Sequence, residues 1–295
     1  MNAIEALIAE EHLPEGYFGV VEAFWQPLAD RIASETKRPL IVGINGAQGS
    51  GKSTLCRFLE QLLAERQLRA VTLALDDLYL TRAERQALAR DEHPLFATRG
   101  VPGTHDVALG EAILDAIAAG RPATLPRFDK AADDRAAEGM PVGPPIDVVL
   151  FEGWCVGAVP QPATALREPV NALERDEDPD ATWRREVNRR LATDYAELFA
   201  RIDILVMLKV EGFEAVRANR KLQEDKLARA NPGGAAILDD AALDRFLMHY
   251  ERLTRWMLAE MPARSDSLIE IGPDQQPLRS ADGVRAHRAG IDAFR

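Results

Sequence analysis

The feature that most constrains the fold is a glycine-rich segment, GAQGSGKS at residues 46–53, because of what stands on either side of it. The run LIVGI at 40–44 has the length and continuity of a buried parallel strand. Leu55, Phe58 and Leu62 then recur at the spacing of an amphipathic helix. A strand, a glycine loop and a helix in this order are typical of parallel α/β architectures.

The segment matches the phosphate-binding pattern G-x-x-x-x-G-K-S at every position. Its glycines allow backbone N–H groups to turn towards an anion at a helix N-terminus, where the helix dipole favours negative charge. Lys52 is expected to reach the β- and γ-phosphates of a nucleotide, and Ser53 to ligate Mg²⁺. The predicted nucleotide-binding residues are Gly46, Gln48, Gly49, Ser50, Gly51, Lys52, Ser53 and Thr54.

Four more apolar runs follow the first one, with helical patterns between them. The runs are 70–75, 147–151, 203–210 and 267–271, and the helical patterns are 52–66, 107–119, 181–201, 211–229 and 239–261. Strands that alternate with helices form a parallel sheet covered on both faces. The sequence therefore predicts a P-loop NTPase fold, a three-layer α/β/α sandwich with a mainly parallel five-stranded sheet.

Two regions lie outside this alternation. Residues 17–36 carry apolar side chains at helical spacing, which predicts an N-terminal helical extension over 1–37 that packs on the P-loop domain over 38–295. Residues 158–180 contain several prolines and a mixed charge cluster, ERDEDPD, and are expected to form a surface excursion.

Composition excludes several classes of protein. The net charge of −11 argues against a long nucleic-acid footprint, which requires clustered Lys and Arg. No stretch approaches 18 uninterrupted apolar residues, so no membrane span is expected. The two cysteines have no metal-ligand spacing and suit a reducing compartment. We expect a cytoplasmic protein with a small-molecule partner and no obligate protein partner.

Three classes of P-loop protein compete for this sequence. GTPases usually read guanine with N-K-x-D, which does not occur in the chain, so ATP is the expected nucleotide. Transport ATPases usually end their acidic strand in Asp-Glu, whereas here Glu152 is followed by Gly153. Small-molecule kinases place an aspartate after the second strand, where Asp76 and Asp77 stand. The pattern favours a kinase.

The acidic residues should converge, because ligands of an open parallel sheet bind at the carboxyl ends of its strands. Phosphoryl transfer needs cations on the phosphates, Mg²⁺ and a carboxylate that orients the attacking hydroxyl. Lys52, Asp76 and Glu152 are the predicted catalytic residues, and Ser53 and Asp77 the predicted metal ligands. Side chains alternate along a strand, so Asp76 and Asp77 are not expected to point the same way.

Cations gather in the glycine- and proline-rich segments between the apolar runs at 70–75 and 147–151. Arg99, Arg127, Lys130 and Arg135 lie there, and arginine binds planar carboxylates through two parallel hydrogen bonds. Asp106 is expected to be the N-cap of the next helix. Two residues have open alternatives. His105 is a hydrogen-bonded turn residue or a substrate contact, and Trp154 is a core residue or a pocket wall.

With these blocks in view, the chain resembles the plant-type D-glycerate 3-kinase family, in the wider phosphoribulokinase, uridine kinase and pantothenate kinase group. The resemblance covers roughly residues 38 to 280. It rests on GINGAQGSGKST (43–54), LDDLYLT (75–81), RGVPGTHD (99–106), LPRFDKAADDR (125–135) and VVLFEGWCVG (148–157). It implies transfer of the γ-phosphoryl group of Mg-ATP to a hydroxyl of a small anionic acid, D-glycerate first.

The resemblance also assigns roles to residues. It aligns the family's acidic residue with Asp76, which makes Asp76 the expected base. Acceptor-binding residues are expected within the matching blocks, at Arg99, His105, Asp106, Arg127, Asp129, Lys130 and Trp154. In the related kinases a lid follows the strand that corresponds to 203–210, which makes Arg217 and Arg220 the candidates for lid cations.

The chain departs from the family pattern at one block. The family pattern reads Tyr-Asp-Lys-Ser before a glycine-flanked loop, whereas this chain has Phe128 and Ala131 and a shorter loop. The lost hydroxyls bear on the choice of acceptor more than on the chemistry. The alternatives are therefore a kinase of another hydroxylated metabolite, such as a nucleoside, a pantothenate-like compound or a sugar acid, and a non-catalytic ATP-binding regulator.

Overall fold

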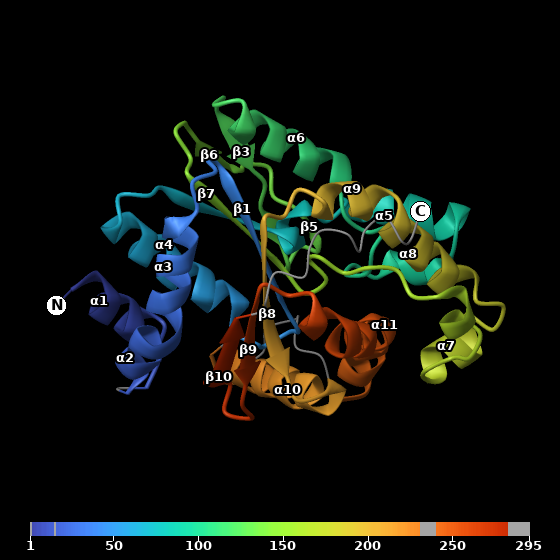
Figure 1. The fold of residues 1–295 in the computed structure, drawn as a ribbon. Helices are drawn as coiled ribbons and strands as arrows, with labels where there is room; N and C mark the ends of the chain where they lie inside the picture. Colours follow the sequence, from blue (N-terminus) through green and yellow to red (C-terminus); the bar gives the residue numbers. More distant parts are fainter. Residues whose placement is uncertain (1, 15, 231–239, 283–295) are drawn as a thin grey trace.

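A central sheet organises the chain in the computed structural model, which describes residues 2–14, 16–230 and 240–282 (Figure 1). Within those residues the sheet has six strands in the order β10-β9-β8-β1-β7-β2. They are β1 (Leu40–Gly46), β2 (Ala70–Ala74), β7 (Val148–Gly153), β8 (Ile204–Val210), β9 (Ser267–Ile271) and β10 (Pro277–Asp282). All neighbours pair in parallel except β10 and β9.

The five predicted strands are confirmed to within two residues at each end. The predicted strand count is wrong by one, because β10 adds an antiparallel edge strand. Its sequence, PLRSAD, lacks the continuous apolar run that identifies a buried strand. Leu278 is 62% exposed, and a strand that buries so little of its apolar surface does not need a continuous run of apolar residues.

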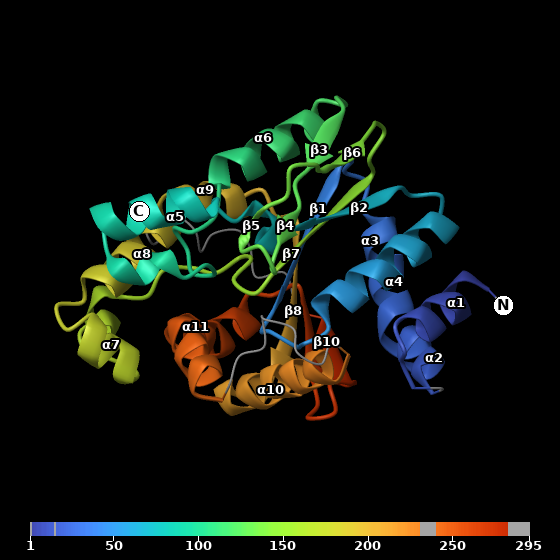
Figure 2. The ribbon, with the colours of Figure 1, turned by 180° about the vertical axis from the view of Figure 1, so that it is seen from behind.

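Two apolar cores lie on opposite faces of the sheet, since successive side chains of a strand point to opposite sides. Val148 and Leu150 of β7 belong to one core, whereas Val149 and Phe151 belong to the other. The first core includes residues of the helices α1 (Ala3–Glu10), α2 (Tyr17–Val20), α3 (Gln26–Ser34) and α4 (Lys52–Glu65). The second includes residues of α6 (Val107–Ala118), α9 (Asp194–Phe199) and α11 (Asp240–Glu260). Figures 1 and 2 show these helices on the two sides of the strands.

The helices along the chain are mostly as the sequence predicts. They are α1 (Ala3–Glu10), α2 (Tyr17–Val20), α3 (Gln26–Ser34), α4 (Lys52–Glu65), α5 (Arg82–Asp91), α6 (Val107–Ala118), α7 (Ala172–Glu177), α8 (Thr182–Ala192), α9 (Asp194–Phe199), α10 (Phe213–Ala230) and α11 (Asp240–Glu260). The expected helix over 181–201 is divided, because Thr193 leaves helical geometry at φ −116° and ψ −99°. Residue 239, the first of the last predicted helix, lies outside the described residues.

The N-terminal helices pack against α4. The pattern over 17–36 forms α2, a π-helical stretch (Val21–Trp25) and α3 instead of one regular helix. Tyr17 stacks on Phe58 of α4 with ring centroids 5.4 Å apart, and Arg57 pairs with Glu10 and Glu11. The helix that follows the glycine loop is therefore braced along its outer side. Among the described residues, no helix has both the length and the apolar composition that a membrane span requires.

The region 158–180 contains a 3₁₀ turn (Ala163–Leu166) and α7, and two buried arginines hold it. Arg252 of α11 binds both carboxylate oxygens of Glu174, at 2.7 and 2.6 Å, and two backbone carbonyls. Arg184 of α8 pairs with Asp178 at 2.9 Å and also binds backbone carbonyls. The side chain of Glu174 is 0% exposed, so these are desolvated ion pairs.

We predict that Glu174→Gln destabilises the protein by about 3–5 kcal/mol, because removing one partner leaves the Arg252 charge buried and unpaired. Urea-induced unfolding monitored by circular dichroism measures the change. Asp176→Asn is the matched control, since Asp176 pairs with Arg175 on the exposed face of the same helix. Equal stability of the two variants would show that Arg252 is not held through Glu174.

Candidate active site

The glycine loop forms the phosphate cradle that the sequence predicts. Gly49 and Gly51 have positive φ values of 75° and 88°, which side chains other than glycine rarely adopt. A Cβ atom on Gly46 would lie 2.4 Å from the Oγ atom of Ser50, so this position also requires glycine. Helix α4 begins at Lys52, whose Nζ atom donates to the carbonyl of Ala47 at 3.2 Å.

Two side chains of the loop have polar atoms without a protein partner. The Oε1 atom of Gln48 and the Oγ atom of Ser50 are buried and accept or donate no hydrogen bond within the described residues. A buried hydroxyl without a partner is costly, so Ser50 suits an anion that accepts a hydrogen bond from this hydroxyl. Thr54 is placed differently, because its hydroxyl donates to Glu11 at the end of α1, at 3.2 Å.

Ser53 and Glu152 meet at the carboxyl ends of β1 and β7. The Ser53 hydroxyl donates to Oε1 of Glu152 at 2.8 Å. Glu152 is buried, and burial raises its pKa, against the opposing effects of Lys52 and of the Ser53 hydrogen bond. The two oxygens are hard donors of the kind that Mg²⁺ prefers. Within the described ranges, no three His, Cys, Asp or Glu residues gather as a metal site.

Asp76 and Asp77 follow β2 on a 3₁₀ turn (Leu75–Leu78), not on the strand itself. The expectation that they alternate as strand residues is wrong in its premise, because β2 ends at Ala74. Their side chains still go to different partners. Asp76 accepts from the Tyr79 hydroxyl at 2.8 Å and from Lys130 at 2.7 Å.

Asp77 instead accepts from the backbone N–H of Phe128 at 2.9 Å and from Arg127 at 3.3 Å. These bonds fasten the strand β4 (Phe128–Asp129) to the turn. The predicted metal-binding role of Asp77 stays a prediction, and the structure brings Glu152, not Asp77, into contact with Ser53.

The two aspartates also differ in acidity. Burial opposes ionisation of Asp76, but Lys130, Tyr79 and Lys52 outweigh it and hold its pKa at about 2. Burial raises the pKa of Asp77, partly offset by the Phe128 N–H and Arg127. Asp76 is therefore ionised throughout the neutral range. A carboxylate this acidic orients a hydroxyl but accepts its proton late, which suits a loose phosphoryl-transfer transition state.

A short hairpin supplies the cations that pair with these aspartates. It consists of β4 and β5 (Asp134–Arg135), and Phe128 pairs with Arg135 across it. Its Lys130 and Arg127 reach Asp76 and Asp77, as described above. Asp129 is exposed and accepts from the N–H groups of Ala131 and Ala132 at 2.8 and 3.0 Å, so it shapes the turn.

Arg99 lies on the other side of the hairpin. It pairs with Asp133, a turn residue with φ 54°, and its guanidinium lies 5.5 Å from the centre of the Phe128 ring. Arg85 of α5 approaches the same carboxylate at 3.0 Å and the same ring at 5.8 Å. The carboxylate that Arg99 binds here belongs to the chain itself, and the predicted contact of Arg99 with an acceptor stays a prediction.

Three aromatic side chains anchor the segment 99–105 from behind. The Tyr250 hydroxyl donates to the carbonyl of Arg99 at 2.9 Å, and Trp154 Nε1 donates to that of Gly100 at 2.8 Å. Gly103 N–H donates to the Tyr195 hydroxyl at 2.9 Å. Trp154 is 2% exposed, so the structure shows it as a core residue, which is one of the two alternatives left open by the sequence.

His105 and Asp106 end this segment. His105 stacks on Tyr79 with centroids 4.7 Å apart, and its Nδ1 atom lies 2.7 Å from the Tyr195 hydroxyl. Burial lowers the pKa of His105 to about 3, so it is neutral. Asp106 caps α6 by accepting from Leu109 N–H at 3.0 Å, as predicted, and it also pairs with Arg135 at 3.2 Å.

The two lid candidates on α10 differ in exposure. Arg217 pairs with Asp244 of α11 at 2.6 Å, and its side chain is 51% exposed. Arg220 is partly buried, and its charge acts on Tyr250, whose pKa burial raises and Arg99 and Arg220 lower. The lid role of both arginines stays a prediction.

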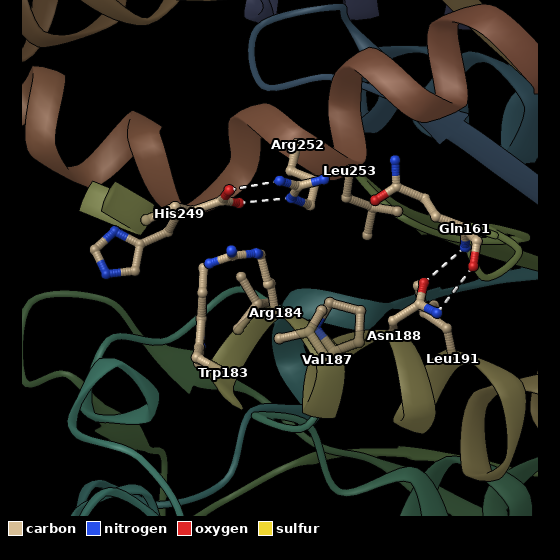
Figure 3. Close-up of a pocket in the computed structure, with 12 residues that line it drawn as sticks. Gln161, Trp183, Arg184, Val187, Asn188, Leu191, His249, Arg252 and Leu253 are labelled. Carbon is tan, nitrogen blue, oxygen red and sulfur yellow. Dashed lines mark hydrogen bonds and ion pairs between the residues drawn. The ribbon is translucent and has the colours of Figure 1, made fainter. Parts of the chain in front are cut away.

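A cavity elsewhere in the molecule is too small for an acceptor. It measures about 20 Å³, lies between α8 and α11, and is lined by residues that include Trp183, His249 and the two buried arginines (Figure 3). A cavity of this size holds about one water molecule. Its two arginines are already paired with Asp178 and Glu174, so we place the candidate site at the sheet edge.

Comparison with known proteins identifies the family. No protein-family model matches the chain. It is 36% identical over 226 residues to the uncharacterized kinase mug58 of Schizosaccharomyces pombe, covering 72% of this chain and 79% of that protein. It is 31% identical over 260 residues to the chloroplastic D-glycerate 3-kinase of Arabidopsis thaliana, covering 81% of this chain and 54% of that protein.

A solved structure agrees with these relatives. The D-glycerate 3-kinase from Cryptococcus neoformans var. grubii superposes with a TM-score of 0.73 at 27% identity, covering 88% of this chain and 99% of that one. The chain belongs to the family of P-loop kinases that includes D-glycerate 3-kinase. It is an ATP-dependent kinase that phosphorylates an alcohol group of a small molecule.

Sequence reasoning missed several residues of this kinase's site. Tyr79 and Asp133 lie inside the quoted blocks, where only the partners found in space reveal their contacts. Arg85 gave no signal, because its helix, RAERQALARD, reads as a solvated surface helix, yet its side chain is 2% exposed. Glu11 lies outside the motifs, and Tyr195 ends a segment, VNRRLATDY at 187–195, in which the resemblance is weak, so both reach the site only through the fold.

We predict that Asp76→Asn lowers kcat by about 10²- to 10⁴-fold while ATP still binds, because the change removes the carboxylate that orients the acceptor hydroxyl. Asp77→Asn keeps an acceptor for the Phe128 N–H and should cost less. Steady-state kinetics with both variants provide the comparison. A larger loss of kcat for Asp77→Asn would show that Asp77, not Asp76, is the base. Small losses for both variants would point to Glu152.

We also predict that Lys130→Met moves the acid limb of the kcat/KM profile to higher pH. Lys130 lowers the pKa of Asp76, whereas burial raises it, so loss of the lysine shifts that pKa upwards. The wild-type limb due to Asp76 should lie near its pKa of about 2, below the working range. In rate profiles from pH 4 to 8 the wild type should therefore show no acid limb from Asp76, whereas the variant should show one. A variant profile as flat as that of the wild type would show that Lys130 does not control Asp76.

Proposed function

We propose that this kinase transfers the γ-phosphoryl group of ATP to the 3-hydroxyl of D-glycerate, giving 3-phosphoglycerate. The observation that supports it most directly is the arrangement of Arg99 and Asp76 on two sides of one aromatic pair. Phe128 contacts Arg99, and Tyr79 packs on Phe128 at 5.1 Å and bonds Asp76. An acid with a nearby hydroxyl matches a guanidinium for its carboxylate and a carboxylate for its hydroxyl.

The residues at the head of α4 suit Mg-ATP. Lys52 and the loop N–H groups would hold the phosphates, and Ser53 with Glu152 would hold Mg²⁺, which neutralises phosphate charge when bound. Asp76 orients the acceptor hydroxyl in this assignment, and Lys130 exchanges its contact with Asp76 for one with the reacting groups. Arg217 and Arg220 are the candidates for lid cations in this assignment.

Other features of the proposal remain expectations from the sequence. The acceptor is a small anionic hydroxy acid, and no protein partner or nucleic acid is needed for turnover. The cytoplasmic location stays a prediction. The lost hydroxyls at Phe128 and Ala131 keep a second candidate open within the same class, a kinase of another hydroxylated metabolite.

A coupled assay for ADP tests the proposal, with D-glycerate, uridine, pantothenate and several sugar acids as acceptors. We expect D-glycerate to give the largest kcat/KM, and ³¹P NMR to place the phosphate on its 3-hydroxyl. Lys52→Ala is the control and should lower kcat by at least about 100-fold at unchanged thermal stability, because it removes a cation from the transferring phosphates.

Other outcomes of these assays would contradict parts of the proposal. Preference for a nucleoside or pantothenate would replace D-glycerate by that acceptor. ATP binding without turnover of any acceptor would instead support the non-catalytic regulator. A larger thermal stabilisation by GTP than by ATP at equal concentration would overturn the choice of nucleotide.

A further inference from the structure

The carboxylate of Asp133 lies between two arginines in the structure. Arg99 pairs with Oδ1 and Arg85 with Oδ2, the latter at 3.0 Å. Both guanidinium groups also lie over the ring of Phe128, at 5.5 and 5.8 Å from its centre. Asp133 thus presents a carboxylate to Arg99 in the way that an acid substrate would.

Building on the proposed function, we propose that Asp133 is a specificity-determining residue, whose carboxylate competes with the carboxylate of the acceptor acid for Arg99. Binding of the acid then requires exchange of one carboxylate for another at the same guanidinium. The affinity for acid acceptors is set by this internal competitor as well as by the arginine itself.

The two arginines differ in what they can offer an acceptor. Arg85 is 2% exposed and donates to the carbonyls of Leu80, Ala97 and Asp133, so it is a fixed part of the wall. The Arg99 side chain is 24% exposed and its backbone is anchored by Tyr250. Arg99 is therefore the arginine that is able to change its carboxylate partner.

The position of Asp133 also allows it to give up its contact with Arg99. Its side chain is 34% exposed, and its φ of 54° is a conformation that a non-glycine residue adopts at a cost. It lies in the turn between β4 and β5, and the same hairpin carries Lys130, which pairs with Asp76 at 2.7 Å. One displacement of this turn would free Arg99 for a carboxylate and Asp76 for a hydroxyl.

The test is the substitution Asp133→Asn with D-glycerate as the acceptor. Asparagine tolerates positive φ and keeps an oxygen for Arg85, but it removes the charge that competes for Arg99. We expect KM for D-glycerate to fall about two- to fivefold, the factor that a partly exposed ion pair supplies. The KM for ATP and kcat should not change.

Three further variants make the result specific. Asp134→Asn is the matched control, since Asp134 bonds backbone N–H groups of Arg82 and Arg135 and should leave KM unchanged. Asp133→Gly, which suits the same φ, should repeat the fall in KM if the asparagine variant folds poorly in thermal unfolding. In an Arg99→Gln background, which raises KM, Asp133→Asn should have no further effect.

An unchanged or raised KM for D-glycerate in folded Asp133→Asn and Asp133→Gly would overturn the inference and make Asp133 a structural partner of the arginines. A fall in KM that persists in the Arg99→Gln background would also overturn it. Failure of the wild-type kinase to phosphorylate D-glycerate is a different result, because it removes the proposed function together with the inference.

Discussion

The site depends on the register of three neighbouring strands, β1, β7 and β2. Ile44 of β1, Glu152 of β7 and Ala74 of β2 lie in one row across the sheet, because parallel pairing aligns them. The row places the glycine loop, the buried glutamate and the aspartate turn at one edge. A slip of one residue in β7 would turn Glu152 to the opposite face and away from Ser53, so burial of both faces protects the chemistry by fixing the register.

The charged residues at this edge of the sheet are paired with one another. Asp76, Asp77 and Arg99 are each paired with a residue of the same small hairpin, in the segment 127–133. A cleft of like charges would be costly to hold together, and the hairpin lowers that cost by supplying opposite charges. In the proposed reaction, the carboxylate of the acid would replace Asp133 at Arg99, and its hydroxyl would replace Lys130 at Asp76. The hairpin would thereby couple acceptor recognition to the state of the base.

Sequence reasoning recovered the parts of the molecule that local patterns encode. Continuous apolar runs located the five parallel strands, and the glycine loop was identified down to its individual residues. Edge strand β10 was missed because an exposed strand such as PLRSAD leaves no apolar run. The partners of the site residues were not predictable in the same way. Arg85 and Tyr195 act across 48 and 90 residues of sequence, and a buried arginine in a charged helix has no local signature.

The contacts that hold the excursion over 158–180 leave its surface side chains free to vary among relatives. Arg184 and Arg252 bind main-chain carbonyls of Ala165, Leu166, Arg167 and Glu168, which every amino acid supplies. The path of the turn is thus specified by two arginines and their carboxylates, not by the side chains along it. Selection is free to rewrite the outward-facing residues of this turn, and so the character of the surface, while the four anchoring groups keep its backbone in place.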